Sequence, residues 1–533
     1  MRRPSAPVIS IVLLASLLAL LSCAPPPHSQ PPGARLEMMI QAETLHYTED
    51  VTQFYVENGG VAVWVGANNR VNLLALIRAV DNSSVHGLTP EHYHPSILRA
   101  AGDASSRMEA DAFLTDVYFT LAHHLKFGKV DPITIESTWS FAPGAFNAPA
   151  YLQSALAQGH VGASLDDLAP AHEEYTRLQE GLAYYSGVGA EGGWSYISRG
   201  ETLHPGDQGP RVAQLRARLE ATGDMMESRT QADLYTDDLE SAVMQFQRRA
   251  ALPADGVVGP ETLARLNQSP SERVAQIRAT LERWRWLPAD LGARHIRVNI
   301  AGFQLEAWAN GARVRTHGAI VGRTYRRTPV FSADLQYFIL NPWWETPYSI
   351  AVQDKLPQFR RSPEVIATRG YEIRDADNRI VDSAGINWNT VSAEQFPYRI
   401  RQAPGPLNAL GQIKFIFPNQ HNVYIHDTPS RELFAEGRRD FSSGCIRIEN
   451  PLVLADWVLN GEQGWRPEEV RSAVEGGAET RIDLNRRIPV HILYFTTLVG
   501  GDGRLRFLDD IYQRDTAVLT ALNAAPGQDA GQK

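Results

Sequence analysis

Cysteine is nearly absent from this 533-residue sequence, which contains only Cys23 and Cys445. So little cysteine fits an exported protein that must keep one thiol unpaired in an oxidising space. It also argues against metal binding. The histidines that could suggest a metal site have neither a cysteine nor an acidic cluster beside them, so we predict surface or cap positions for them and no metal or cofactor; they are His92, His94, His123 and His124.

Long apolar runs are equally scarce, and the single one lies at the start, from Val8 to Leu21. Arg2 and Arg3 precede it, as in the positively charged end of a signal peptide, and the run is too short to span a membrane comfortably. We therefore predict a signal segment at 1–23 and export of the protein.

The signal segment ends at Leu21-Ser22-Cys23, which resembles the lipobox at which bacterial lipoproteins are cleaved and acylated, although Leu21 replaces the usual small residue. We predict lipidation at Cys23, with ordinary cleavage or an uncleaved anchor as the alternatives. A proline-rich tether follows at 24–40 and would hold the protein off the membrane. The lack of aspartate at Ala24 favours the outer membrane without deciding between the two membranes.

Positive charge is in deficit, with 51 Lys and Arg against 60 Asp and Glu, which gives a net charge of −9. This balance argues against nucleic-acid binding. The apolar fraction of 43% and the charged fraction of 21% are ordinary for globular protein, and the length allows three domains.

The first two domains are expected to be helical. Apolar stripes at helical spacing, such as Leu73 to Val80 and Phe113 to Leu125, predict a helical scaffold domain at 41–197, and Gly128 is expected to end the second helix. Residues 198–270 alternate glycine-rich turns with three amphipathic helices.

Strand patterns dominate the third part, which we place at 280–500. A segment at 345–408 that contains Trp388 interrupts the strands and is predicted to be a cap, while 501–533 is expected to be a partly disordered C-terminal segment. The predicted fold class is α+β multidomain, with a mostly β third domain. The predicted strands are 296–300, 303–307, 319–322, 337–340, 413–417 and 422–426.

Cys445 follows a turn-forming Ser-Ser-Gly, and His426 precedes it by 19 residues, a separation that suits two adjacent strands. A lone cysteine is commonly a small buried hydrophobe. Here, small residues before it would let backbone N–H groups around Gly444 and Cys445 point at an oxyanion, and a nearby imidazole would take the thiol proton. We therefore predict a cysteine nucleophile with a histidine base.

Two families resemble this sequence. Residues 203–267, with Gly206, Gly209 and Asp255-Gly256, are similar to the peptidoglycan-binding type 1 module, which serves in some proteins only as a spacer. The C-terminal part resembles the catalytic domain of the L,D-transpeptidases, in the large multidomain Gram-negative branch. This resemblance implies the periplasm of a Gram-negative bacterium as the location, with membrane anchoring as a lipoprotein. The motifs behind this second resemblance are Val321-Gly322-Arg323-Thr324, Thr328-Pro329, Pro404-Gly405-Pro406, Asn408-Ala409-Leu410-Gly411, Tyr424-Ile425-His426 and Ser443-Gly444-Cys445-Ile446-Arg447.

The resemblance implies an enzyme that cross-links peptidoglycan stem peptides through a thioester on Cys445 and that accepts carbapenem-type β-lactams there. It also implies that the backbone carbonyl near Asp427 holds the His426 ring. Its substrates would be stem peptides on glycan strands. Ser443 stands where most members of the family have histidine, and the large branch resembles this sequence in having serine there. The hydrogen bonding of that turn is therefore in question.

Two further residues are candidates for substrate contact. Arg447, two residues after the nucleophile, would hold a substrate carboxylate or shape the loop, with a structural salt bridge as the alternative. Tyr424, two residues before His426 on a strand, would face the same side as the histidine. With Ser443 these residues form the predicted substrate-binding set.

Other functions remain to be weighed. A papain-like protease is disfavoured because its cysteine precedes its histidine in the chain. The sequence leaves open a carboxypeptidase that uses water as acceptor, a transpeptidase that anchors a wall protein, and a non-catalytic peptidoglycan-binding scaffold. It does not indicate the oligomeric state.

The lipidation hypothesis makes the first testable prediction. We expect Cys23→Ser to move the protein from the membrane fraction to the soluble periplasmic fraction, because the acyl chains would have no attachment point. Fractionation followed by immunoblotting measures this, with the wild-type protein as control. An unchanged membrane distribution would favour an uncleaved anchor.

Overall fold

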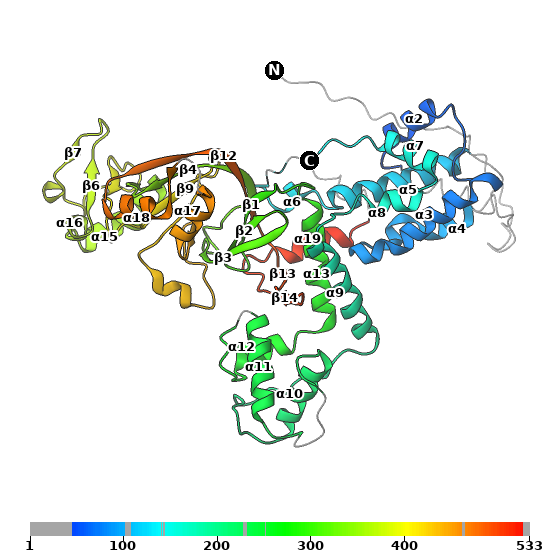
Figure 1. Cartoon of the computed structure of the whole chain (residues 1–533), viewed down its shortest axis with the longest axis horizontal. Coiled ribbons are helices and arrows are strands. Elements are labelled where there is room, and N and C mark those ends of the chain that lie inside the picture. Colours follow the sequence, from blue (N-terminus) through cyan, green and yellow to red (C-terminus); the bar gives the residue numbers. More distant parts are fainter. Residues whose placement is uncertain are drawn as a thin grey trace, which may run out of the picture.

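The structure is a computed structural model that describes residues 45–101, 108–139, 141, 144–226, 232–250, 252–460 and 464–525. The predicted signal segment, the tether and Cys23 lie outside these residues. Within the described ranges no helix is long and apolar enough to cross a membrane. The molecule is elongated, with the N-terminal helices at one end, the cap at the other and the three-helix module projecting from the middle (Figure 1).

The N-terminal unit is helical, as predicted, because its apolar stripes pack into one shared core. Leu73, Leu76 and Val80 are buried on α3 (Arg70–Asn82). The main helix, α5 (Met108–Phe127), ends at Gly128, whose φ of 87° confirms the predicted helix stop. Around these lie α2 (Thr48–Glu57), η1 (Ala67–Asn69), η2 (Ser83–His86), η3 (Pro90–Tyr93), α4 (Pro95–Ala101), α6 (Pro132–Ile135), α7 (Ala148–Gln158) and α8 (Val161–Asp166).

The module consists of α10 (Pro210–Ala221), α11 (Asp237–Arg249) and α12 (Pro260–Leu266), which confirms the three predicted helices. They close on a separate small core that includes Leu215, Val243 and Phe246. Gly256 has a φ of 71°, and an added Cβ there would lie 2.7 Å from the Glu240 side chain. Glycine is therefore required at this turn.

Two long helices, α9 (Glu173–Ala190) and α13 (Pro270–Arg285), connect the three units. They pack side by side between the N-terminal helices, the module and the barrel (Figure 1). A capping box between Ser269 and Glu272 starts α13. The pattern of α13 was not recognised in the sequence, because the helix is buried on several sides and has charged residues within its buried faces.

One charged pair on α13 is completely buried. Glu282 and Arg285 form an ion pair and are both 0% exposed. Glu282 also accepts a hydrogen bond from the Val130 N–H at 2.7 Å, and Arg285 donates to the His86 carbonyl at 2.7 Å and to the Tyr175 hydroxyl at 2.8 Å. This network ties α13 to the N-terminal unit and to α9.

The third unit is a closed eight-stranded barrel in the order β1-β12-β4-β9-β10-β11-β3-β2. Most neighbours are antiparallel, but β1 with β12 and β10 with β11 are parallel. The strands are β1 (Arg294–Asn299), β2 (Gln304–Ala309), β3 (Ala312–Ile320), β4 (Phe331–Leu340), β9 (Ile413–Ile416), β10 (Ile425–His426), β11 (Ile446–Ile448) and β12 (Thr480–Leu493). Two helices, α17 (Pro451–Leu459) and α18 (Pro467–Glu475), follow β11.

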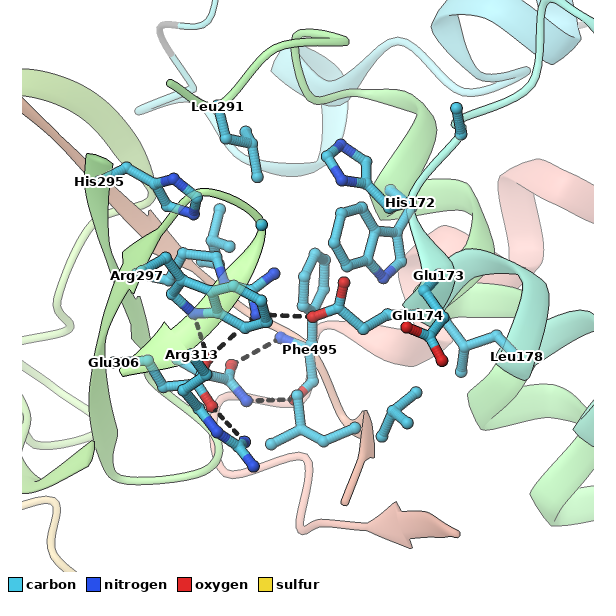
Figure 2. A pocket seen from close by; sticks show the side chains of 18 of the residues that line it. His172, Glu173, Glu174, Leu178, Leu291, His295, Arg297, Glu306, Arg313 and Phe495 are labelled. Atoms are coloured by element: carbon cyan, nitrogen blue, oxygen red, sulfur yellow. Dashed lines mark hydrogen bonds and ion pairs between the residues drawn. The ribbon is translucent and has the colours of Figure 1, made fainter. Parts of the chain in front are cut away.

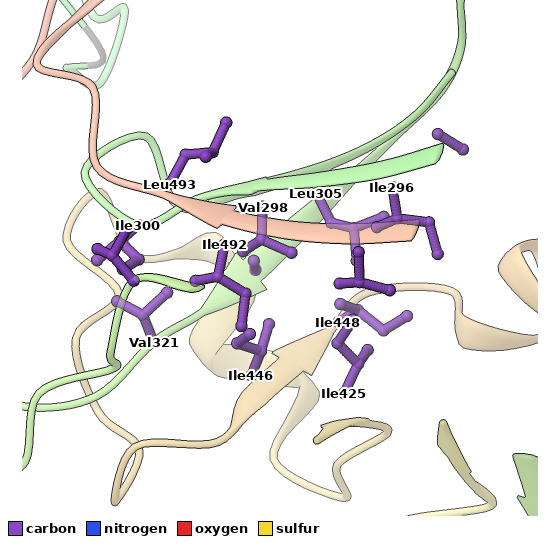
Figure 3. Packing of buried hydrophobic residues seen from close by; sticks show 14 of the residues in the cluster. Ile296, Val298, Ile300, Leu305, Val321, Ile425, Ile446, Ile448, Ile492 and Leu493 are labelled. Carbon is purple, nitrogen blue, oxygen red and sulfur yellow. The ribbon is translucent and has the colours of Figure 1, made fainter. Parts of the chain in front are cut away.

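Aliphatic side chains from opposite strands fill the barrel interior (Figure 3). Ile425 of β10 and Ile446 of β11 point into this core and are both 0% exposed. Because side chains alternate along a strand, the neighbours of these isoleucines face the opposite side of the sheet. The functional residues discussed below lie on that outer side.

The cap is an insertion with its own small core, which contains Trp388 at 3% exposure. Its four-stranded sheet has the order β5-β8-β6-β7 and lies at the far end of the molecule (Figure 1). The elements are β5 (Trp344–Glu345), α14 (Tyr348–Ile350), the π-helical turn η4 (Ala351–Lys355), α15 (Leu356–Arg361), α16 (Val365–Thr368), β6 (Tyr371–Arg374), β7 (Ile380–Val381), η5 (Ser383–Gly385) and β8 (Arg399–Gln402).

The C-terminal segment differs from the expectation of partial disorder over residues 501–525. It continues from β13 (Thr497–Val499) into β14 (Leu505–Phe507) and ends in α19 (Asp515–Asn523). Tyr512 is 1% exposed, and Leu522 packs in the N-terminal core. The segment thus belongs to the folded body, and residues 526–533 lie outside the described range.

The predicted barrel strands are present in the structure, but their ends differ from the predicted ones. Asn422 has a φ of 53°, and the Asn419 side chain accepts hydrogen bonds from the N–H groups of His421 and Val423, so β10 begins only at Ile425. Phe303 has a φ of 49° and lies in the turn before β2. Side-chain hydrogen bonds and left-handed turns thus shortened strands that apolar alternation had extended.

The buried pair on α13 makes a stability prediction. Glu282→Leu should lower the free energy of unfolding by about 3–5 kcal/mol, because it leaves the Arg285 charge buried without its partner. Chemical denaturation measures the change. The matched control is Glu180→Leu, which removes an exposed pair of the same i,i+3 spacing with Arg177 and should leave the midpoint unchanged. Equal effects of the two substitutions would contradict this role of burial.

Candidate active site

Parallel pairing of β10 and β11 brings the predicted site residues together. Ile425 is paired with Ile446, and His426 with Arg447. Since the isoleucines point into the barrel, His426 and Arg447 lie on its outer side. Tyr424, two positions before His426, and Cys445, two positions before Arg447, lie on the same side. The centres of the Tyr424 and His426 rings are 5.5 Å apart. The expected orientation of Tyr424 is confirmed.

These residues line a pocket of about 790 Å³. One wall is the Cys445 loop with β10 and β11, and a second is the loop at 323–329. The third wall comes from the cap, through Trp344, Pro347 and the residues up to Lys355. Thr138 of the N-terminal unit also reaches the rim. The size suits a peptide segment rather than a single small ion.

His426 is fixed as one tautomer by the backbone. Its Nδ1 lies 2.5 Å from the Asp427 carbonyl oxygen, so Nδ1–H donates and Nε2 is left unprotonated. Burial, reinforced by the Arg447 charge, lowers the pKa of His426 to about 3. The imidazole is therefore a neutral proton acceptor throughout the physiological pH range. The Asp427 side chain is occupied elsewhere, accepting from the Gln412 N–H at 2.9 Å.

The Cys445 thiol is half-buried and points toward the Asn422 carbonyl, 3.9 Å from its sulfur. Burial raises its pKa, while the Tyr424 N–H and hydroxyl, Lys414 and Arg447 oppose that rise. In the described residues no hydrogen bond joins the thiol to His426, whose paired neighbour is Arg447 and not Cys445. Such contacts commonly form only when substrate is bound.

The hydrogen bonds of the nucleophile turn distinguish the two backbone donors that the sequence suggested. The Gly444 N–H already donates to the Ser442 hydroxyl at 3.0 Å. The hydrogen bonds found for residues 442–447 do not use the Cys445 N–H. Gly444 instead allows the backbone conformation of the turn, because its φ of 116° is a value that other residues rarely adopt. The Cys445 N–H is the available oxyanion donor.

Two residues to which the sequence analysis gave no role brace this turn. The Thr328 hydroxyl donates to the Gly444 carbonyl at 2.9 Å and accepts from the Gly322 N–H at 2.8 Å. Tyr512, from the C-terminal segment, donates to the Gly322 carbonyl at 2.5 Å and accepts from the Thr328 N–H at 3.1 Å. The Thr328-Pro329 motif hinted at the first, and no local signal marks Tyr512.

Ser443 links the nucleophile turn to the cap. Its hydroxyl accepts a hydrogen bond from Arg326 at 2.9 Å, and the same guanidinium forms an ion pair with Asp354 of the cap at 2.6 Å. The Ser443 side chain at this position of the turn is thus hydrogen-bonded to Arg326. Arg326 thereby holds cap and catalytic turn in one arrangement.

Arg447 makes no ion pair among the described residues, and its buried Nε has no hydrogen-bond partner. Burial lowers its pKa. The structural salt bridge considered for it is therefore not found. Arg323 and Arg327 line the same pocket. Within the part of the chain that the structure describes, none of these three guanidinium groups forms an ion pair with a carboxylate. Such a cavity favours anionic ligands.

A second pocket, of about 650 Å³, lies between α9 and the barrel strands β1 and β2. Its polar groups already bind one another (Figure 2): Arg297 forms ion pairs with Glu174 at 2.6 Å and with Glu306 at 3.1 Å. Trp308 is stacked between Arg297 and His295. The cavity therefore belongs to the junction of α9 with the barrel.

The described residues contain no cluster of three or more histidine, cysteine or acidic side chains that could hold a metal ion.

Comparison with protein families agrees with this arrangement. Residues 293–471 match the family described as the L,D-transpeptidase catalytic domain, residues 49–182 match a scaffold domain, and residues 208–266 match the family described as "Putative peptidoglycan binding domain". The chain thus contains an L,D-transpeptidase catalytic domain, preceded by a helical scaffold domain and a peptidoglycan-binding type 1 domain.

Individual relatives carry the same description. A protein of Haemophilus influenzae named "Putative L,D-transpeptidase" is 35% identical over 226 residues, which is 42% of this chain and 45% of that relative. A solved L,D-transpeptidase from Xylanimonas cellulosilytica aligns at 16% identity over 56% of this chain and 99% of its own, with a TM-score of 0.19. One from Stackebrandtia nassauensis aligns at 12% identity over 56% and 96%, with a TM-score of 0.22.

The bracing of the nucleophile turn is testable with Thr328→Val. The isosteric change leaves the Gly444 carbonyl and the Gly322 N–H unpaired, each at a cost of about 1–3 kcal/mol. We expect the rate of Cys445 alkylation by iodoacetamide to change several-fold, because the turn no longer fixes the thiol. The control is Thr324→Val, which changes an exposed threonine of the same loop. Identical alkylation in all three proteins would contradict the bracing role.

Proposed function

We propose that this protein is a peptidoglycan L,D-transpeptidase that forms 3–3 cross-links through a thioester on Cys445. The observation that carries the proposal is the shared face of β10 and β11. It presents a cysteine, a neutral histidine and an arginine to a peptide-sized pocket in a chain with an L,D-transpeptidase catalytic domain.

In the first half-reaction, the Cys445 sulfur attacks the carbonyl carbon at the L-centre of the third stem residue. His426 Nε2 takes the thiol proton, and the Cys445 N–H stabilises the oxyanion. The amide C–N bond then breaks and the protonated amine leaves as D-alanine. The stem remains bound to sulfur as a thioester. The neutral state of His426 suits it to accept this proton.

In the second half-reaction, the side-chain amine of the third residue of another stem attacks the thioester carbonyl. His426 accepts a proton from this amine, the new amide bond forms, and the C–S bond breaks to return the Cys445 thiol. The product is a direct link between two diamino acid residues. The cap excludes water from the pocket and so favours the amine over hydrolysis.

Charge supports stem peptides as the substrate. Their carboxylates are anionic, and the pocket presents Arg323, Arg327 and Arg447, for which the described residues supply no carboxylate partner. Arg447 and Tyr424, next to Cys445 on the same face, are proposed to hold the donor stem, with Ser443 fixing the turn. The helical scaffold domain would position the pocket, and the module at 203–267 would hold the glycan strand. We further propose a periplasmic enzyme anchored through a lipid on Cys23.

The identity of the reaction product distinguishes the candidate functions. Incubation of the protein with disaccharide-tetrapeptide should yield a dimer that is lighter by one D-alanine than two monomers, as measured by mass spectrometry. Cys445→Ala and His426→Ala should each remove nearly all product, since neither residue alone completes the transfer. Tripeptide alone would identify a carboxypeptidase. Neither product, together with normal alkylation of Cys445, would favour the non-catalytic scaffold.

A further inference from the structure

Lys414 lies beside the proposed active site although it does not line the pocket. It is on β9, directly opposite His426 of β10, which is in turn paired with Arg447 of β11. Laterally paired residues of a sheet face the same side. Lys414, His426 and Arg447 therefore form a row across three strands, with the histidine between two cations.

The Lys414 ammonium has one aromatic partner. Its Nζ lies 3.9 Å from the centre of the Tyr424 ring. In the described residues it makes no ion pair, and no hydrogen bond of its ammonium is found there. Burial lowers its pKa, a shift that the nearby Cys445, Glu479 and Glu345 oppose. A half-buried cation without a carboxylate partner is costly for the fold, so another role has to account for it.

Tyr424 connects the ammonium to the nucleophile. It lies directly before Ile425 and Cys445 directly before Ile446, its paired neighbour, and the Ile446 N–H donates to the Tyr424 carbonyl at 3.1 Å. Hydrogen bonding from Tyr424 lowers the pKa of the Cys445 thiol. A cation over the ring face is attracted by the electron density of the ring and makes the phenol a stronger hydrogen-bond donor. The same positive charge also favours negative charge on the sulfur directly.

We propose that Lys414 is a positioning residue that works from behind the pocket: it holds Tyr424 against the Cys445 sulfur, stabilises the thiolate, and with Arg447 keeps His426 unprotonated. The inference deepens the proposed transfer reaction by assigning the electrostatics of its nucleophile. The charged and titratable groups that act on Cys445 and His426 include Lys414 from β9, Tyr424 from the segment before β10, and Arg447 from β11. The same pocket is also lined by Arg323, Arg326, Arg327, Asp354, Lys355 and His421.

The test measures the thiol itself, in a Cys23→Ser background where Cys445 is the only cysteine. The pH dependence of alkylation by iodoacetamide gives the midpoint at which thiolate forms. Removing a cation raises a thiol pKa, so Lys414→Met should move this midpoint upward by about one pH unit and slow alkylation at neutral pH about tenfold. Lys414→Arg, which keeps the charge, should restore most of the difference.

The linkage through Tyr424 is tested in the same assay. Tyr424→Phe should also raise the midpoint, and the double variant with Lys414→Met should shift it by less than the sum of the two changes. A matched control is Lys126→Met, since Lys126 also lies over aromatic rings, 5.6 Å from Phe127 and 5.3 Å from Phe146, but in the scaffold. It should leave the midpoint unchanged.

In transfer assays the acid limb of the pH profile should move to higher pH in Lys414→Met, because His426 loses one flanking cation and binds its proton more readily. An unchanged thiol midpoint in folded Lys414→Met protein, or no restoration by arginine, would overturn the inference. Because alkylation does not depend on transpeptidation, absence of cross-linked product from wild type would overturn the proposed function and leave this result interpretable.

Discussion

The parallel pairing of β10 with β11 is the constraint on which the candidate site depends. It sets Ile425 beside Ile446 inside the barrel, and alternation then requires the intervening polar side chains to share the outer side. A shift of one residue would place a histidine or an arginine in the apolar core, which is energetically prohibitive. The core therefore selects the register, and the register assembles the site.

Segments far apart in the sequence complete that arrangement. Arg326 joins the nucleophile turn to the cap, and Tyr512 from the C-terminal segment holds the loop that braces Gly444. The segment is itself fixed to α13 by the Arg283–Asp515 ion pair at 2.5 Å and to the N-terminal unit by the Arg514–Glu136 pair at 2.6 Å. It is also joined to the module, through the Arg265–Asp509 ion pair at 2.5 Å. The conformation of the turn thus depends on contacts from the cap, the N-terminal unit and the module as well as from the barrel.

The local charge at the site is opposite in sign to the net charge of the protein. The chain is acidic overall, yet the pocket and the sheet below it collect arginines and a lysine around a neutral histidine. This arrangement favours anionic ligands. Burial, reinforced by the Arg447 charge, lowers the pKa of His426 to about 3, so the imidazole is neutral near pH 7. The burial that raises the thiol pKa is opposed by the same cations.

The sequence by itself determined much of this protein. Apolar periodicity predicted α3, α5 and the three module helices, and alternation predicted six barrel strands, because these patterns reflect burial on one face. It did not reveal α13, which is buried on several sides, or β12, whose Pro489 and irregular pairing between Asp483 and Ile488 disguise a strand.

Motif spacing located Cys445, His426 and their neighbours, since a turn and two short strands are local features. Only the tertiary structure decided that the Gly444 N–H is occupied, that Ser443 meets Arg326, and that Lys414 and Tyr512 belong to the site's surroundings. These contacts join residues from different strands, the cap and the C-terminal segment, and a pairing across such distances in the chain leaves no periodic trace in the sequence.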